Sequence, residues 1–213
     1  MPLPTFFNLP EEKREKIIQF ALDEFSTNDY QSASISKIVT KAGIAKGSFY
    51  QYFVNKSDLY TFLLELGAHK KAELMAISRD RNSEVSFFDS LDQLFTTLAT
   101  FEINFPELAR IGYKAATGKS PIPEEMLSDA KQSTQRFFSD MLEKGISRGE
   151  VRKNVDVKAA AFLLATALSE LGNFSAIDPD AVGRSTQTIT DDPQFLLAYH
   201  SILSIIRDGI SSR

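Results

Sequence analysis

Residues 34–56 constrain the fold of this chain more than any other stretch. Apolar residues at helical spacing follow Ser34, which is a candidate N-cap. Gly43 comes next and can adopt the left-handed backbone conformation that a sharp turn between helices needs. A second short helix fits about residues 45–53, with Phe49 and Phe53 one turn apart on its inner face. Two short helices joined by a glycine turn predict a helix-turn-helix.

The same stretch is positively charged within an acidic chain. It contains four lysines and no acidic residue, whereas the whole chain has a formal net charge of -4. Binding to phosphates depends on the lysines that reach them, so local charge matters more than the total. The second helix would present its outer face to a DNA major groove. The residues expected to face DNA are Ser34, Lys37, Lys46, Gly47, Ser48, Tyr50, Gln51, Tyr52 and Lys56.

The run AGIAKGSFYQYF at residues 42–53, followed by Asn55, Lys56 and Leu59, resembles the DNA-binding signature of the TetR family of transcriptional regulators. The resemblance implies base contacts from Lys46, Gly47 and Tyr50. It implies phosphate contacts from Ser48, Tyr52 and Lys56. Ala45 departs from the family pattern, which commonly has Ser or Thr there. Because alanine cannot cap the second helix, we expect a local cost of about 1 kcal/mol.

The segments on either side of the helix-turn-helix are also expected to be helical. A helix that begins near Pro10 would pack on the pair and complete a three-helix domain. Phe6, Phe7 and Leu9 ahead of it predict a short arm that folds back, with a disordered tail as the alternative. Asn55 would cap a longer helix that leads into the second domain and transmits motion between the two.

The remaining pattern stays helical, with segments at about residues 84–104, 106–117 and 123–147. We therefore predict an all-α fold with an N-terminal three-helix helix-turn-helix domain at residues 1–56. Residues 57–213 would form a C-terminal helical bundle for ligand binding and dimerisation.

Apolar residues in the last two helices alternate three- and four-residue spacings, which suits a helical bundle. The spacing fits an intramolecular core as well as a two-fold dimer interface. The TetR resemblance implies a homodimer, and a dimer would read two DNA half-sites. The expected interface residues are Leu164, Leu168, Leu171, Leu196, Tyr199, Leu203, Ile206 and Ile210.

The second domain is rich in aromatic residues, which either pack in its core or line a small-molecule pocket. The family resemblance implies a small-molecule effector in this domain. The candidate lining residues are Phe62, Leu66, Phe101, Phe105, Tyr113, Phe137 and Phe162.

Catalysis has little support in the sequence. The chain has no cysteine and two histidines, His69 and His200, so we expect no catalytic residue, metal site or cofactor. The segment 112–120 resembles a phosphate-binding loop, but it has five residues between its glycines where that loop has four.

The composition and the motif together favour one function. No apolar stretch has the length of a membrane span and no secretory leader is evident, so we expect a cytoplasmic protein. We interpret the chain as a repressor that binds a palindromic DNA operator as a homodimer and is released by a small molecule. Two alternatives stay open: a helical protein-interaction module without sequence-specific DNA binding, and a small helical enzyme.

Overall fold

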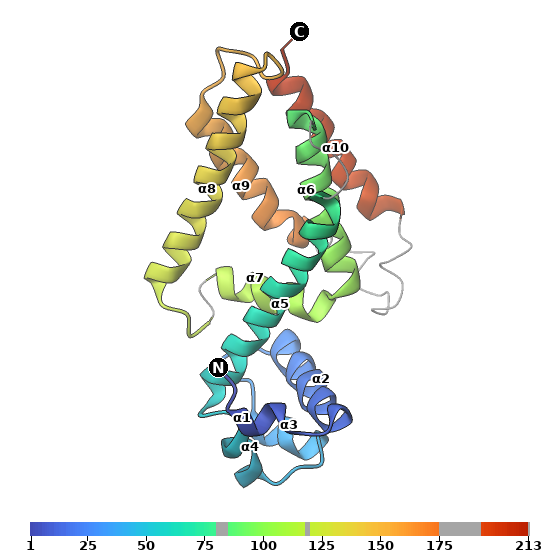
Figure 1. Ribbon diagram of the computed structural model, residues 1–213, viewed down its shortest axis with the longest axis vertical. Helices are drawn as coiled ribbons and strands as arrows, with labels where there is room; N and C mark the ends of the chain where they lie inside the picture. The colour runs from blue at the N-terminus through green and yellow to red at the C-terminus, as the bar shows by residue number, and fades with distance from the viewer. Residues whose placement is uncertain (80–84, 118–119, 175–192, 213) are drawn as a thin grey trace. The chain divides into compact units, whose positions relative to one another are not determined.

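The computed structural model describes residues 1–79, 85–117, 120–174 and 193–212, and helices dominate these residues (Figure 1). In chain order the helices are α1 (Pro4–Phe7), α2 (Glu11–Thr27), α3 (Ile35–Lys41), α4 (Lys46–Tyr52), α5 (Lys56–Arg79), α6 (Phe87–Asn104), α7 (Pro106–Ala116), α8 (Glu124–Ser147), α9 (Val157–Phe174) and α10 (Pro193–Ile210). An isolated antiparallel bridge pairs Val151 with Ser211. The predicted all-α fold is confirmed.

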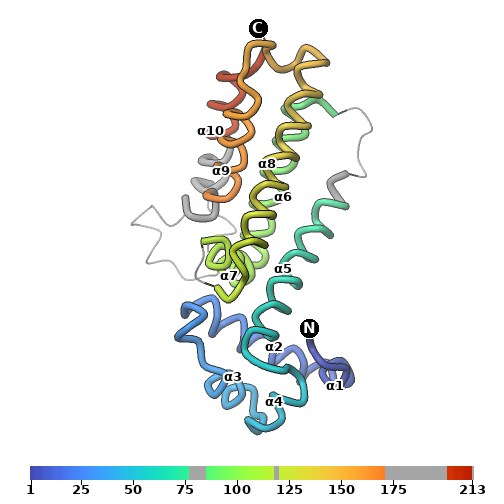
Figure 2. The backbone as a smooth tube through the Cα atoms, turned by 90° about the vertical axis from the view of Figure 1, so that its left-hand side faces the viewer, coloured from blue at the N-terminus to red at the C-terminus, as the bar shows by residue number. Residues whose placement is uncertain are grey.

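The chain folds into two compact units. The first unit contains residues 1–70 and 105–123, and the second contains residues 71–104 and 124–213. Helix α5 begins in the first unit and ends in the second, as the continuous tube in Figure 2 shows. Helix α7 belongs to the first unit although its neighbours α6 and α8 belong to the second. The functional boundary expected between residues 56 and 57 stays a prediction.

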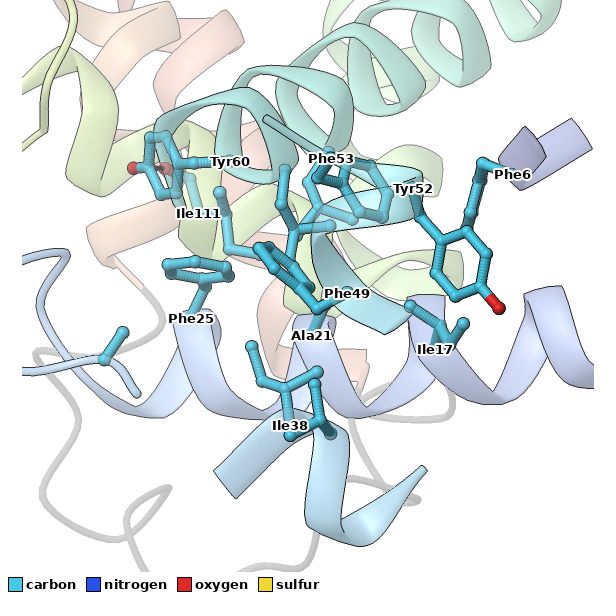
Figure 3. Packing of buried hydrophobic residues seen from close by; sticks show 14 of the residues in the cluster. Phe6, Ile17, Ala21, Phe25, Ile38, Phe49, Tyr52, Phe53, Tyr60 and Ile111 are labelled. Atoms are coloured by element: carbon cyan, nitrogen blue, oxygen red, sulfur yellow. Dashed lines mark hydrogen bonds between the residues drawn. The ribbon is translucent and has the colours of Figure 1, made fainter. Parts of the chain in front are cut away.

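The first unit is built around an aromatic core (Figure 3). Helix α2 packs against α3 and α7, and α4 packs against α1 and α3. Phe25, Phe49 and Phe53 are buried at the centre of these contacts, together with Phe6 from α1. The arm predicted at the N-terminus therefore folds back as expected, because Phe6 is a core residue.

Helix α5 begins at the predicted cap. The side-chain oxygen of Asn55 accepts a hydrogen bond from the amide of Asp58 at 2.9 Å. The Asp58 carboxylate in turn accepts a hydrogen bond from the amide of Val54 at 3.1 Å. The two bonds resemble a capping box, except that Asp58 accepts from the residue before the cap, and they fix where α5 starts.

The second unit is a bundle in which α8 packs on α9, and α6 packs on α8, α9 and α10. Phe87, Phe95, Phe138 and Leu142 are among its buried residues. Helix α8 approaches its neighbours closely at Gly145, where an added Cβ would lie 2.8 Å from the Val151 side chain. No helix among the described residues is long and apolar enough to cross a membrane.

Candidate nucleic-acid interface

The turn between α3 and α4 has the geometry that the sequence predicts. Gly43 has a φ of 67°, in the left-handed region. Its amide donates to the carbonyl oxygen of Thr40 at 3.2 Å, and the amide of Ile44 donates to that of Val39 at 3.0 Å. This pair of bonds is a Schellman motif, which ends α3 and redirects the chain into α4.

Helix α4 is fixed by its inner face and exposes its outer face. Phe49 is 1% exposed and Phe53, which follows the helix, is 0% exposed. The rings of these two residues stack with their centroids 5.6 Å apart. Four of the residues expected to face DNA are exposed on this helix: Lys46, Gly47, Tyr50 and Gln51. Their side chains and backbone are therefore accessible to a ligand as large as a DNA duplex.

Two further residues expected on α4 are less accessible. Ser48 is half-buried. Tyr52 is 7% exposed, and its ring lies 6.4 Å from that of Phe6, centroid to centroid. Most of the Tyr52 side chain is therefore part of the core, as Figure 3 shows. The phosphate contacts expected for these two residues stay predictions.

The start of α3 is held by a buried carboxylate that sequence reasoning missed. Glu24 of α2 is 6% exposed and accepts a hydrogen bond from the Ser34 amide at 2.9 Å. It also forms an ion pair with exposed Lys37 at 3.8 Å. The Ser34 hydroxyl caps α3 as predicted by accepting from the Lys37 amide at 3.4 Å. A signal existed, since Glu24 follows Ile17 and Ala21 along the buried stripe of α2.

Lys56 binds the backbone of the turn ahead of α3. Its ammonium donates to the carbonyl oxygens of Tyr30, Gln31 and Ala33 at 2.7, 3.2 and 3.1 Å. It also lies 4.5 Å from the centroid of the Tyr30 ring. An ammonium has three donors, so these bonds account for all of them. Lys56 therefore positions the turn, and the phosphate contact expected for it stays a prediction.

Helix α7 is attached to the end of α2 by a second lysine. The Lys114 ammonium donates to the carbonyl oxygens of Ser26 and Asn28, both at 2.9 Å, and to that of Phe25 at 3.4 Å. A cation is favoured at the C-terminal end of a helix, where the last carbonyls lack partners. Lys114 lies in the segment that resembled a phosphate-binding loop, and its ammonium binds backbone carbonyls at the end of α2.

Burial raises the pKa of Tyr60 on α5 to about 12, with smaller contributions from Tyr30 and Asp29. The phenol is therefore protonated at neutral pH and donates to the Ile111 carbonyl oxygen of α7 at 3.4 Å. Ile111 is 0% exposed in the first unit's core. Helices α5 and α7 are thus joined inside this unit by a polar contact and by packing.

The residues expected to line a pocket are divided between the two units. Phe62, Leu66, Phe105 and Tyr113 lie in the first unit, where Phe62 packs 5.5 Å from Phe6, centroid to centroid. In the second unit Phe101 is 1% exposed, whereas Phe137 and Phe162 are 46% and 60% exposed. A pocket lined by these residues stays a prediction.

The expected dimer residues that the structure describes face their own protomer's core. Leu164 is 2% exposed within the second unit's core, and partly buried residues pack against that core, namely Leu168, Leu203, Ile206 and Ile210. The side chains of Leu171, Leu196 and Tyr199 lie outside the described residues. The intramolecular alternative thus accounts for Leu164. Among the described residues of α9 and α10, the large apolar side chains that are exposed are Phe162, Leu163 and Ile205.

Comparison with known proteins shows the family. Residues 17–61 match the profile of bacterial regulatory proteins of the tetR family, and residues 85–211 match that of tetracyclin repressor-like C-terminal domains. The chain belongs to the TetR family. As a TetR-family protein it is a DNA-binding transcriptional regulator with a ligand-binding C-terminal domain.

Solved structures of other bacterial transcriptional regulators have the same fold. A TetR family transcriptional regulator from Chloroflexus aurantiacus is 36% identical, with a TM-score of 0.84 over the whole of both chains. FadR from Bacillus subtilis, solved in complex with stearoyl-CoA, has a TM-score of 0.67 at 18% identity over 92% of this chain and 98% of that one. The fatty acid metabolism regulator protein of Bacillus subtilis is 23% identical over 95% of this chain and its own full length.

Proposed function

We propose that this TetR-family regulator represses transcription as a homodimer that binds a palindromic operator and is released by a small-molecule effector. The observation that carries the proposal is the exposed face of α4, where Lys46, Tyr50 and Gln51 stand on a helix anchored by buried Phe49. This arrangement combines phosphate attraction with hydrogen-bonding groups for base edges. The protein would act in the cytoplasm, without catalysis.

Dimerisation is supported by the small size of α4, the helix proposed to contact DNA bases. Helix α4 has seven residues, so one copy contacts few base pairs. A two-fold dimer places two such helices in successive major grooves, about 34 to 36 Å apart. The second unit offers exposed apolar side chains for this contact, because Phe162, Leu163 and Ile205 are 60%, 65% and 72% exposed. We add these three residues to the proposed interface.

The effector is proposed to bind the C-terminal domain expected at residues 57–213, which contains all seven candidate lining residues. Acyl-CoA thioesters are the first compounds to test, because a relative that aligns over nearly this whole chain is a fatty acid metabolism regulator. A solved structure of the same fold contains stearoyl-CoA. Release requires only that the effector favours a conformer whose recognition helices are wrongly spaced, and a tenfold loss of operator affinity corresponds to about 1.4 kcal/mol.

Two helices are proposed to carry the signal. Helix α5 continues from the first unit into the second, as expected from the sequence. Helix α7 is the second link, because it is covalently continuous with the second unit at both ends and packs on α2. Its residues Ile111 and Lys114 attach it to the first unit's core and to the end of α2.

The proposal is tested by selecting fragments of the source genome that bind purified protein at physiological salt, with and without added stearoyl-CoA. We expect an enriched inverted repeat whose half-sites are about one helical turn apart. Loss of that repeat when stearoyl-CoA is present would support acyl-CoA as the effector. Retention of fragments without any shared sequence would contradict operator binding.

A further inference from the structure

Helix α4, the proposed recognition helix, is short and has no side-chain cap at its start. It spans seven residues, and its N-cap Ala45 makes no side-chain hydrogen bond to the helix. Isolated helices much shorter than about 12 residues are unstable in water. The placement of α4 must therefore come from contacts with other parts of the first unit.

The C-terminal end of α4 is held by the segment before α2. The amide of Leu3 donates to the carbonyl oxygen of Tyr52 at 2.8 Å. The hydroxyl of Thr5 donates to the carbonyl oxygen of Gln51. Both acceptors belong to the last turn of α4, whose carbonyls have no partner within the helix. Helix α1 and its preceding residue thus supply a cap at the opposite end from Ala45.

Phe6 locks this segment against the end of α4. Its side chain is 0% exposed. The centroid of its ring lies 4.8 Å from that of Phe53, which follows α4, and 5.5 Å from that of Phe62 on α5. Figure 3 shows the Phe6 ring among the aromatic side chains of this core. The neighbouring Phe7 is 53% exposed, so the two phenylalanines have different environments.

We propose that residues 3–6 position the recognition helix for base reading, with Phe6 as the main positioning residue. The segment need not touch DNA, because it fixes the last turn of α4 through backbone acceptors and through Phe53. Contacts to bases require accurate placement of α4, whereas attraction to phosphates depends mainly on charge. Loosening this segment should therefore reduce specific binding more than non-specific binding. The proposal rests on the operator binding proposed above.

The test compares affinity for the selected operator with affinity for a scrambled duplex of equal length and composition, at one salt concentration. We expect Phe6→Ala to lower the ratio of the two affinities by about tenfold, and Phe6→Leu to restore most of it. Thr5→Val keeps the side-chain shape but removes one hydrogen bond, so we expect about a three- to fivefold loss.

Two matched variants serve as controls and should leave the ratio unchanged. Phe7→Ala removes an exposed ring from the same helix. Thr117→Val removes a hydroxyl that donates locally, to the Tyr113 and Lys114 carbonyl oxygens at the end of α7. Far-UV circular dichroism would establish the folded fraction of every variant.

A purely structural role for Phe6 would lower both affinities in proportion to the folded fraction. An unchanged ratio in folded Phe6→Ala and Thr5→Val would therefore overturn the positioning role while the unaltered chain still discriminates. If Phe6→Ala fails to fold, Thr5→Val decides by the same ratio, because its core is intact. Equal affinity of the unaltered chain for both duplexes would overturn operator binding and the positioning role together.

Discussion

The ammonium nitrogen of Lys56 lies 2.7 Å from the carbonyl oxygen of Tyr30 and 4.5 Å from the centroid of its ring. The first residue of α5 therefore holds the turn that precedes α3. The family resemblance implies a phosphate contact for Lys56, whereas in the structure its ammonium donates to three backbone carbonyl oxygens. The two roles predict different changes in the salt dependence of DNA affinity when Lys56 is replaced.

Lys56→Met should destabilise the first unit by about 1 to 3 kcal/mol, because three carbonyl oxygens lose a charged donor. We expect the slope of log affinity against log salt to stay unchanged. Lys46→Met is the matched control, because Lys46 is exposed at the start of α4. Its loss should reduce the magnitude of the negative slope by about one. Thermal unfolding and salt titrations measure both. If Lys56→Met instead reduces the magnitude of the slope without destabilising the protein, Lys56 contacts DNA phosphates.

Tyr50→Ala tests the exposed face of α4, the proposed recognition helix. Tyr50 is 53% exposed, so we expect a stability change within about 0.5 kcal/mol. Operator affinity should fall by about tenfold if the ring meets base edges, while affinity for scrambled DNA should change much less. Gln19→Ala on the exposed surface of α2 is the control. Equal losses on both duplexes would assign Tyr50 to the DNA backbone.

Lys114→Met removes the charged contact between α7 and the end of α2. We expect destabilisation by about 1 to 3 kcal/mol and faster amide hydrogen exchange in residues 25–29, because the carbonyls there lose their donor. Lys131→Met is the control, since Lys131 is exposed on α8. Exchange rates that match those of the unaltered protein would show that Lys114 does not hold this turn.

Two glycines should respond in opposite ways to the same change. Gly145→Ala places a Cβ 2.8 Å from the Val151 side chain and 3.1 Å from the Phe87 ring, so we expect destabilisation by about 1 to 3 kcal/mol. Gly112 lies within α7, and no atom beyond the neighbouring residues and backbone of that helix lies within 4 Å of an added Cβ, so alanine there should stabilise by about 0.5 to 1 kcal/mol. Denaturant unfolding of both variants checks the contrast, and shifts in the same direction would contradict the packing described.

Local patterns predicted the local structure well. Gly43 marked the turn because a left-handed residue follows α3, and Asn55 with Asp58 marked the start of α5. Hydrophobic spacing likewise identified Phe49 and Phe53 as anchors. Each of these signals involves residues within one or two helical turns of each other, where spacing alone decides the geometry.

Long-range partners were beyond the sequence. The acceptors of Lys56 and Lys114 are backbone carbonyls 23 or more residues away. Every residue has a backbone carbonyl, so the sequence does not indicate which of them accept these bonds. Periodicity placed Leu164 on the apolar face of its helix but did not show what packs against that face. In the structure it is the core of the same protomer. For the same reason the packing of α7 on α2 could not be predicted from the sequence.

The central claim is that α4 reads DNA sequence. The most direct measurement is the affinity of the purified protein for the selected operator and for a scrambled duplex at physiological salt. We predict a ratio of at least about 1,000 in favour of the operator, with two protein chains bound to each duplex. Equal affinities for the two duplexes, from folded protein without effector, would contradict the claim.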